Sequence, residues 1–432
     1  MTGPSIQQLK KQLKFLKQEK GILSRQIGQV KKNSDDPSNL INQIQTFSEQ
    51  IKDVESALKD FKEEDNQDHF ETIEPVSPSQ FKPFKPLETH YSKITVDIHR
   101  EQADWDEYIN NHPNATIYHR WSIKTVIEKT FGHQTHYLSA RDETGKIQGI
   151  LPLVELNSRL FGHFLISMPF FNYGGILFSD TNTQQQLLTR ASELAQELNA
   201  GHIEFRDCHP QMELPEKSEK IAMLLTLPAS TEMLWKNIGT KLRAQIKKSE
   251  RNKLQTKIGS QELVKDFYQV FSTNMRDLGT PVYSPKLFDN MLKQHESSRL
   301  IVIYHLGKPI SGGFVLGWRN TLEIPWASTL RSSNKLDANM KLYWEVLKYA
   351  IQSGYEIFDF GRSSKDANTY KFKKQWGAKP FDLYWHYWLP DNQPLPEINP
   401  DNPKFKLMIW CWKRLPVWIA NLLGPNLVKN LP

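Results

Sequence analysis

The sequence holds few cysteines and no long apolar run, and both scarcities exclude classes of protein. Only Cys208 and Cys411 occur in 432 residues. Two such distant cysteines make neither a disulfide framework nor a metal site, and they suit a reducing compartment. No apolar run approaches the roughly 20 residues that a helix needs to cross a bilayer. The opening residues, MTGPSIQQLKKQLK, lack the apolar core of a signal peptide. We therefore expect a cytoplasmic protein.

Histidine, aspartate and glutamate do not cluster at the spacing of metal ligands, so we expect no metal and no bound cofactor. The formal net charge is +7. This excess predicts an anionic partner, which could be a nucleic acid, a phosphorylated carrier or a membrane surface. The length allows two or three domains, each with its own core.

Residues 1–64 carry apolar side chains at alternating spacings of three and four, interrupted by turn formers around Pro37. The repeated positions are Ile6, Leu9, Leu13, Leu16, Leu23, Ile27 and Val30, then Leu40, Ile44, Phe47, Ile51, Val54, Leu58 and Phe61. Two such stripes predict an antiparallel α-helical coiled-coil hairpin. The hairpin is similar to the helical arm of seryl-tRNA synthetases, which holds tRNA, so tRNA binding is one possible role. Homo-oligomerisation through the coiled coil is the other.

The remaining chain divides by composition into four parts. Residues 65–93 are first acidic and then proline-rich, which predicts a linker. Residues 94–227 and 228–390 each alternate strand and helix patterns, which predicts two α/β (α+β) lobes. Residues 391–432 read as a proline-rich segment and an amphipathic tail.

The stretch YEIFDFGRSSKDANTYKFKKQWG, residues 355–377, concentrates the candidate chemistry. Asp359 lies on a short predicted strand that Gly361 ends, and a polar turn follows. Lys373 is expected at the mouth of a pocket, between Phe372 and Trp376, which are either substrate contacts or core. Rigid strand ends followed by loops are common places for catalytic groups.

The run TYKFKKQWGAKP, preceded by FDFGRS, resembles the C-terminal signature of FemAB-type aminoacyltransferases. The resemblance is nearest to FemAB-like proteins of exosortase/PEP-CTERM and exopolysaccharide systems. It extends over about residues 95–390 through TIYHRW, SMPFFNYGGIL, KLRAQIKKSERNKL, NMRDLGTPVYS and NMKLYWEVLKYA. It implies two acetyltransferase-like (GNAT) lobes, the second of the BioF2-like type. It also implies a role in transfer for Lys373 and a place in a substrate wall for Tyr173.

Acyl transfer to an amine needs positive charge at the developing oxyanion and a group that accepts the amine proton. Lys373 is the candidate for the first role and Asp359 for the second, although Asp359 could instead form an ion pair with Arg362. The predicted substrate-binding residues are Tyr173, Arg243, Lys247, Trp326, Arg362, Phe372 and Trp376. His119, beside an aromatic residue near a helix start, is expected to be a structural hydrogen bonder.

The segment 236–257 holds eight lysines and arginines and one acid. Such density predicts contact with an anion, because the charges otherwise repel one another. Acyl-CoA enzymes of the GNAT type usually hold the pyrophosphate on a glycine-containing turn before a helix, and residues 331–339 contain no glycine. We therefore favour aminoacyl-tRNA as the acyl donor over acyl-CoA.

The tail places Trp410, Trp412 and Trp418 among aliphatic and basic residues. This composition predicts peripheral membrane contact through residues 404–423, on the inner face of the membrane, and packing on the second lobe is the alternative. Together the patterns predict an acyl- or aminoacyltransferase that modifies an amine on a small-molecule or lipid-linked envelope or exopolysaccharide precursor. The alternatives are a non-catalytic membrane-associated scaffold and an acyl-CoA-dependent N-acetyltransferase.

Overall fold

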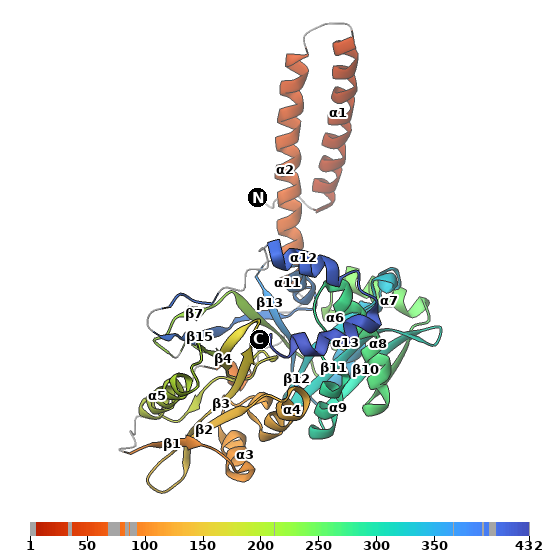
Figure 1. The fold of residues 1–432 in the computed structure, drawn as a ribbon. Helices are drawn as coiled ribbons and strands as arrows, with labels where there is room; N and C mark the ends of the chain where they lie inside the picture. The colour runs from red at the N-terminus through yellow and green to blue at the C-terminus, as the bar shows by residue number, and fades with distance from the viewer. Residues whose placement is uncertain are drawn as a thin grey trace. The chain divides into compact units, whose positions relative to one another are not determined.

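The computed structural model describes residues 6–32, 37–67, 78–82, 86, 93–210, 212–365, 367–390, 393–396 and 403–431. The chain divides into two compact units, Met1–Glu74 and Pro75–Pro432. In the first unit α1 (Ile6–Lys32) and α2 (Ser38–Gln67) lie side by side and antiparallel (Figure 1). Leu9 and Leu16 of α1 are buried with Ile51 and Val54 of α2. The predicted turn at residues 33–36 lies outside the described residues.

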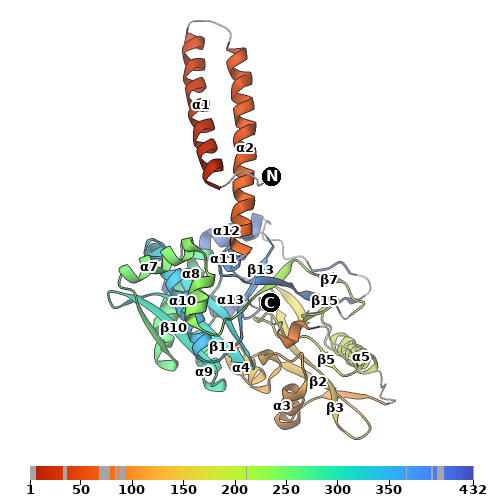
Figure 2. The same ribbon diagram turned by 180° about the vertical axis from the view of Figure 1, so that it is seen from behind.

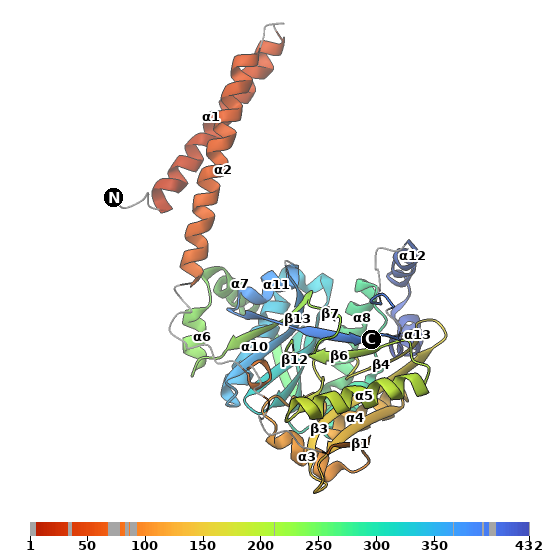
Figure 3. The same ribbon diagram turned by 90° about the vertical axis from the view of Figure 1, so that its left-hand side faces the viewer.

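One sheet of the second unit has the strand order β1-β2-β3-β4-β6-β15-β7, and β5 pairs with β3 at its side. Neighbours are antiparallel except β4 and β6. The helix α5 (Thr181–Glu197) lies along this sheet (Figure 3). The strands are β1 (Thr95–Ile98), β2 (Thr135–Arg141), β3 (Ile147–Ser158), β4 (Gly162–Ile166), β5 (Leu177–Phe178), β6 (Ile203–Asp207), β7 (Glu216–Lys217) and β15 (Tyr384–Trp388).

The other sheet has the order β14-β8-β13-β12-β11-β10-β9. Its one parallel pair joins β12 to β13, which the crossover helix α10 (Ala338–Gln352) connects. A parallel pair requires such a crossover. The strands are β8 (Lys220–Thr226), β9 (Gln255–Gly259), β10 (Ser298–His305), β11 (Lys308–Trp318), β12 (Thr321–Thr329), β13 (Ile357–Ser364) and β14 (Lys379–Asp382).

Helices cover both faces of this second sheet (Figure 2). The contacts of two neighbouring glycines of β11 show which helix lies on which face. A Cβ on Gly312 would meet Phe267 of α8 (Val264–Leu278), whereas one on Gly313 would meet Leu342 of α10. Successive strand residues point to opposite faces, so α8 and α10 lie on opposite sides. The remaining helices are α3 (Gln102–Asn111), α4 (Trp121–Phe131), α6 (Thr231–Asn237), α7 (Thr240–Arg251), α9 (Pro285–Gln294), α11 (Asn368–Lys374), α12 (Pro403–Trp412) and α13 (Val417–Val428).

The two sheets exchange strands across the boundary predicted between residues 227 and 228. β8 precedes that boundary but pairs with β13 and β14 of the second sheet. β15 follows the second sheet in the chain but pairs with β6 of the first. The observed architecture is mixed α/β with two sheets, and each sheet is completed by a strand from the other side of residue 227.

Gly361 does not end its strand, contrary to the sequence-based expectation. β13 continues to Ser364, and its pairing with β8 is interrupted between Asp359 and Arg362 by a register shift. Gly361 has a φ of 72°, which lets the strand bulge and resume. Most of the predicted linker, 65–93, and much of the proline-rich segment after residue 390 lie outside the described residues.

Candidate active site

Two carboxylates meet where two strands of the second sheet part. The parallel pairing of β12 with β13 runs from Thr321 and Ile357 to Glu323 and Asp359, and it stops there. Pro325 follows on β12 and has no N–H to donate to a ladder. Directly opposed residues share one face of the sheet, so the Glu323 and Asp359 side chains are neighbours. The sequence analysis predicted Asp359 and missed Glu323.

The hydroxyl and amide donors to these carboxylates come mainly from the first-sheet half of the unit. Tyr118 donates its O–H to Glu323 Oε2 at 2.7 Å, and Asn172 Nδ2 donates to Oε1 at 3.1 Å. Tyr173 donates its O–H to Asp359 Oδ2 at 2.7 Å. The other oxygen, Oδ1, accepts the backbone N–H of Gly361 at 2.7 Å. These neutral donors stabilise the buried oxygens without supplying a counter-charge.

Burial raises the pKa of both carboxyl groups. Burial, and then the charge of Asp359, raise the pKa of Glu323 to about 8. Burial raises the pKa of Asp359 to about 6, against the hydrogen bonds from Tyr173 and Gly361 and the charge of Lys373. Burial therefore favours retention of a proton by this pair, and the charge of Asp359 adds to the effect at Glu323. Carboxyl groups whose pKa values are separated in this way can divide acid and base roles.

Lys373 lies inside the protein and not at a pocket mouth, where the sequence analysis expected it. Its side chain is 6% exposed. Its ammonium donates to the carbonyl oxygens of Gly361 at 2.9 Å and Arg362 at 2.8 Å. Burial lowers the pKa of Lys373 to about 8, although the charges of Asp359 and Glu323 oppose this shift. The bulge of β13 explains the placement, because Lys373 partners carbonyls that lie just past the last residue paired with β12.

The loop that carries Tyr173 is fixed by close backbone contacts. Gly174 has a φ of 134°, and a Cβ there would overlap Met168, while a Cβ on Gly175 would overlap the Asp207 carboxylate. His119 accepts the backbone N–H of Thr116 at 3.0 Å and donates to the Gly175 carbonyl at 3.0 Å. His119 is thus a buried hydrogen bonder, as expected from the sequence.

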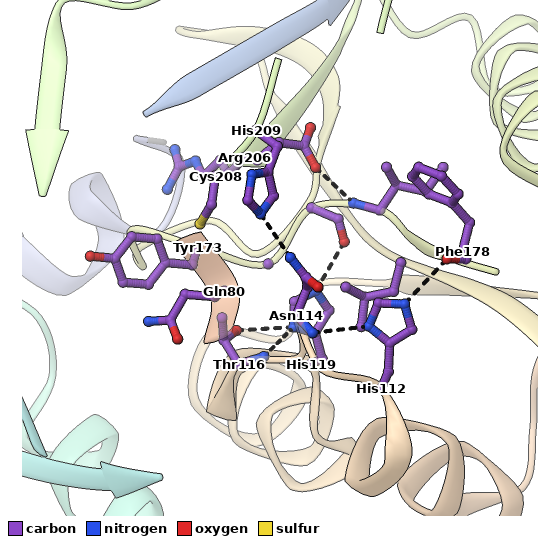
Figure 4. Close-up of a pocket in the computed structure, with 15 residues that line it drawn as sticks. Gln80, His112, Asn114, Thr116, His119, Tyr173, Phe178, Arg206, Cys208 and His209 are labelled. Carbon is purple, nitrogen blue, oxygen red and sulfur yellow. Dashed lines mark hydrogen bonds between the residues drawn. The ribbon is translucent and has the colours of Figure 1, made fainter. Parts of the chain in front are cut away.

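Two small cavities adjoin Tyr173. One, about 30 Å³, lies among residues of the first-sheet half, including His112, His119 and Cys208 (Figure 4). The other, about 20 Å³, is lined by Glu323 and Asp359. Gln80 lines both cavities and is buried. Its neighbour Phe81 meets the Tyr173 ring edge-on at 5.7 Å.

The Gln80 segment, Pro78 to Lys82, therefore belongs to the site, although its proline-rich surroundings predicted only a linker. Apolar periodicity predicts strands and helices, but this segment forms only one short 3-10 turn, Ser79–Phe81. The sequence pattern therefore gave no signal for it. A more open cavity lies elsewhere, between α3 and the turn after β2, away from both carboxylates.

The other predicted substrate contacts have diverse surroundings. Arg362 forms no ion pair with Asp359 in the described structure, and its guanidinium stacks over Trp385 at 4.8 Å. Trp376 is fully buried, and Phe372 packs against Tyr343 with ring centroids 4.9 Å apart. Trp326 is buried in an aromatic cluster with Phe171, Tyr283, Phe288 and Phe314.

The basic helix α7 buries Leu242, Ile246 and Ser249 and turns most of its charges outwards. Lys247 is exposed and lies 5.8 Å from the centre of the Trp235 ring, and Arg243 is half-buried. Among the described residues, neither side chain forms a hydrogen bond or an ion pair with the carboxylates, so the two lie on a separate surface. Within that same part of the chain, no cluster of His, Cys, Asp and Glu has the arrangement of a metal site.

Comparison with known proteins finds a family match within the second-sheet half. A family model described as an acetyltransferase (GNAT) domain matches residues 237–374, which include Glu323, Asp359 and Lys373. No curated protein matches the chain. The crystal structure of FemX superimposes with a TM-score of 0.52 at 12% identity, covering 68% of this chain and 96% of FemX.

Lower scores relate the chain to L-PGS from Bacillus licheniformis (TM-score 0.45, 10% identity, 70% of this chain and 96% of that one). A tandem GNAT protein from the clavulanic acid pathway gives 0.43 at 10% identity, covering 70% of this chain and all of the other. At 12% identity the likeness to FemX concerns the fold alone. Residues 237–374 thus match a GNAT acetyltransferase domain, and the fold of the chain is similar to that of FemX.

Proposed function

We propose that the protein is an acyl- or aminoacyltransferase that acylates an amine. The observation that carries the proposal is the Glu323–Asp359 pair at the parting of β12 and β13, inside a GNAT domain and beside Lys373. Two adjacent carboxyl groups are costly to bury. Such a pair with different pKa values is useful where a reaction must transfer a proton.

In the proposed reaction the amine nitrogen attacks the acyl carbonyl and forms the N–C bond. Asp359, the more acidic carboxyl, takes the amine proton, and Glu323 gives its proton to the leaving oxygen or sulfur as that bond breaks. Lys373 supports the oxyanion electrostatically, held in place by two carbonyl oxygens. Tyr118 and Tyr173 keep the two carboxylates oriented.

Among donors, aminoacyl-tRNA is favoured over acyl-CoA. The turn at residues 331–336 leads into α10, where a pyrophosphate would sit at the helix N-terminus. Asp337 already supplies a carboxylate there, and Lys248 of α7 neutralises it at 2.8 Å. Lys248, engaged with this carboxylate, has less charge to offer a pyrophosphate at that place. The exposed charges of α7, with Arg243 and Lys247, offer phosphate contacts of the kind tRNA needs.

The donor is tested by binding. Labelled tRNA and labelled acetyl-CoA are titrated against the protein over a range of salt concentrations. We expect tRNA affinity that falls steeply with salt, and a flatter slope after Lys241, Arg243, Lys247 and Lys248 are all changed to alanine. The matched control removes four exposed lysines elsewhere, Lys129, Lys286, Lys293 and Lys308. Saturable acetyl-CoA binding without tRNA binding would select the acyl-CoA alternative.

For the acceptor, the sequence resemblance supports a small-molecule or lipid-linked envelope or exopolysaccharide precursor. An exosortase/PEP-CTERM setting rests on that resemblance alone. The apolar cluster between α1 and α2 supports a coiled-coil hairpin; it is formed by Leu9, Leu16, Ile51 and Val54. We propose that this hairpin serves either as a contact between copies of the chain or as an arm that holds tRNA.

The activity is tested with isolated envelope precursors, labelled aminoacyl-tRNA or acetyl-CoA, and mass analysis of the products. Lys373→Met should abolish transfer while keeping the side-chain volume, and Lys374→Ala, an exposed neighbour on α11, should not. Melting curves show whether each variant folds. Full transfer by folded Lys373→Met would overturn the assigned site. No transfer from either donor by the unaltered protein would favour the scaffold alternative.

A further inference from the structure

The C-terminal helices α12 and α13 are fixed to the second unit by one face. Ala420, Gly424 and Val428, one turn apart on α13, are buried. A Cβ on Gly424 would come within 2.9 Å of the Val282 backbone nitrogen, so only glycine allows this close approach. Arg276 of α8 donates to the Leu415 carbonyl between the two helices. The inner face of the tail therefore packs on the second lobe, which was the alternative to membrane contact in the sequence analysis.

The opposite face of the same helices is apolar and exposed. Trp418 is 68% exposed and Leu422 is 65% exposed, and they lie one turn apart on α13. The other large exposed apolar residues of the tail are Leu407, Met408, Trp410 and Leu423. Soluble surfaces rarely leave so many large apolar side chains together, and such patches mark interaction sites.

The charge of the tail selects the partner. Residues 403–431 contain five basic residues, Lys404, Lys406, Lys413, Arg414 and Lys429, and no aspartate or glutamate. The Arg414 guanidinium lies 3.7 Å from the centre of the Trp410 ring. Tryptophan rings and basic groups on an apolar helix face match the boundary between lipid headgroups and acyl chains. A second copy of this face would carry the same positive charge and be repelled.

We propose that the outer face of α12 and α13 docks on the surface of an anionic phospholipid bilayer. The helices are too short to cross it, and none of the described helices has the length and apolar composition to do so. The inner face holds them to the GNAT domain, so docking brings the whole second unit to the membrane. This proposal stands apart from the proposed reaction, because its test measures no transfer.

The test is flotation of the purified full chain with vesicles of phosphatidylglycerol and phosphatidylcholine, and with vesicles of phosphatidylcholine alone. We expect binding to the anionic vesicles that weakens at high salt. The double variant Trp418→Ser with Leu422→Ser should bind at least about tenfold more weakly, since it removes two apolar anchors. Its matched control, Leu160→Ser with Leu306→Ser, removes exposed leucines elsewhere and should bind as before.

Equal melting temperatures for the two double variants show that lost binding is not lost folding. The proposal is overturned if the full chain stays with the soluble fraction at low salt, if neutral vesicles bind it equally, or if the tail variant binds like its control. Sedimentation velocity without lipid adds a further outcome. A dimer that the tail variant abolishes, with no vesicle binding, would assign this face to a second copy instead.

Discussion

The two sheets of the second unit both bury charged side chains, but they compensate them differently. In the first sheet Arg206 donates to Glu204 at 2.7 Å, and Asp207 lies 3.3 Å from His386. In the second sheet Glu323 and Asp359 face each other with tyrosine hydroxyls as donors, while Lys373 bonds to carbonyl oxygens. In the first sheet the Glu204 carboxylate thus has a guanidinium partner. Uncompensated carboxylates give the second sheet groups that can exchange protons near neutral pH.

The largest expected effect removes the proposed base. Asp359→Asn keeps the shape of the side chain but cannot accept the amine proton. Its amide oxygen can still accept the Gly361 N–H, while its NH2 group can donate to the Tyr173 hydroxyl oxygen. We expect kcat/KM to fall by about 100- to 10 000-fold with little loss of stability, because a neutral amide is easier to bury than a carboxylate. The measurement is steady-state transfer at pH 7. Asp382→Asn, on the exposed β14, is the control, and activity above half in Asp359→Asn would place the base elsewhere.

The next effect concerns stability and the first sheet. Arg206→Met leaves the Glu204 carboxylate buried without its counter-charge, so the free energy of unfolding should fall by about 3–5 kcal/mol. Adding Glu204→Gln removes the stranded charge and should restore much of the loss. Urea unfolding of the single and double variants measures both. If Arg206→Met unfolds like the unaltered protein, the charges of the first sheet are not structural and the contrast between the sheets fails.

A smaller effect of opposite sign is expected at Glu323. Its pKa is raised from 4.5 to about 8 in the folded protein, so between these values the folded state holds a proton that the unfolded state has lost. Stability therefore decreases as pH rises through this window. Glu323→Gln does not titrate and should be more stable than the unaltered protein by about 3–4 kcal/mol at pH 8, with little difference at pH 4.5. A constant difference across that range would contradict the raised pKa.

The contrast also explains how much of the site was predictable. Asp359, Lys373 and Tyr173 lie in continuous motifs, and the sequence named all three. Glu323 had one signal, an acid between Leu322 and Ile324 in an apolar strand, but its partner is fixed by a parallel pairing across α10. Sequence spacing does not reveal such long-range pairing.

The fold shows the same division between local and distant information. Periodicity predicted the alternation of strands and helices in both halves, because elements such as α4 and α5 are amphipathic by themselves. It did not predict that β8 and β15 change sheets, since both are apolar enough for either core. Nor did it predict the burial of Gln80, which depends on cavities formed by distant segments.

The smallest expected effect compares two chemically equal hydrogen bonds, one in each sheet. Tyr173 donates to Asp359 at 2.7 Å and Tyr387 donates to Glu204 at 2.8 Å. The Tyr173 bond opposes the burial that raises the pKa of Asp359 to about 6. In Tyr173→Phe that pKa should rise by about one unit, because the ionised form loses a donor.

Transfer needs the ionised form of Asp359, so in Tyr173→Phe the acid limb of the kcat/KM profile should move to higher pH by the same amount. Activity would then fall severalfold at pH 6 and recover as the pH approaches 8. Tyr387→Phe should leave the limb in place, because Glu204 keeps Arg206 and takes no part in the proposed reaction, and it should cost about 1 kcal/mol of stability. If the acid limb shifted equally in both variants, the shift would reflect a general loss of structure and not the pKa of Asp359. A limb that moves only in Tyr173→Phe would tie the titrating base to the second sheet.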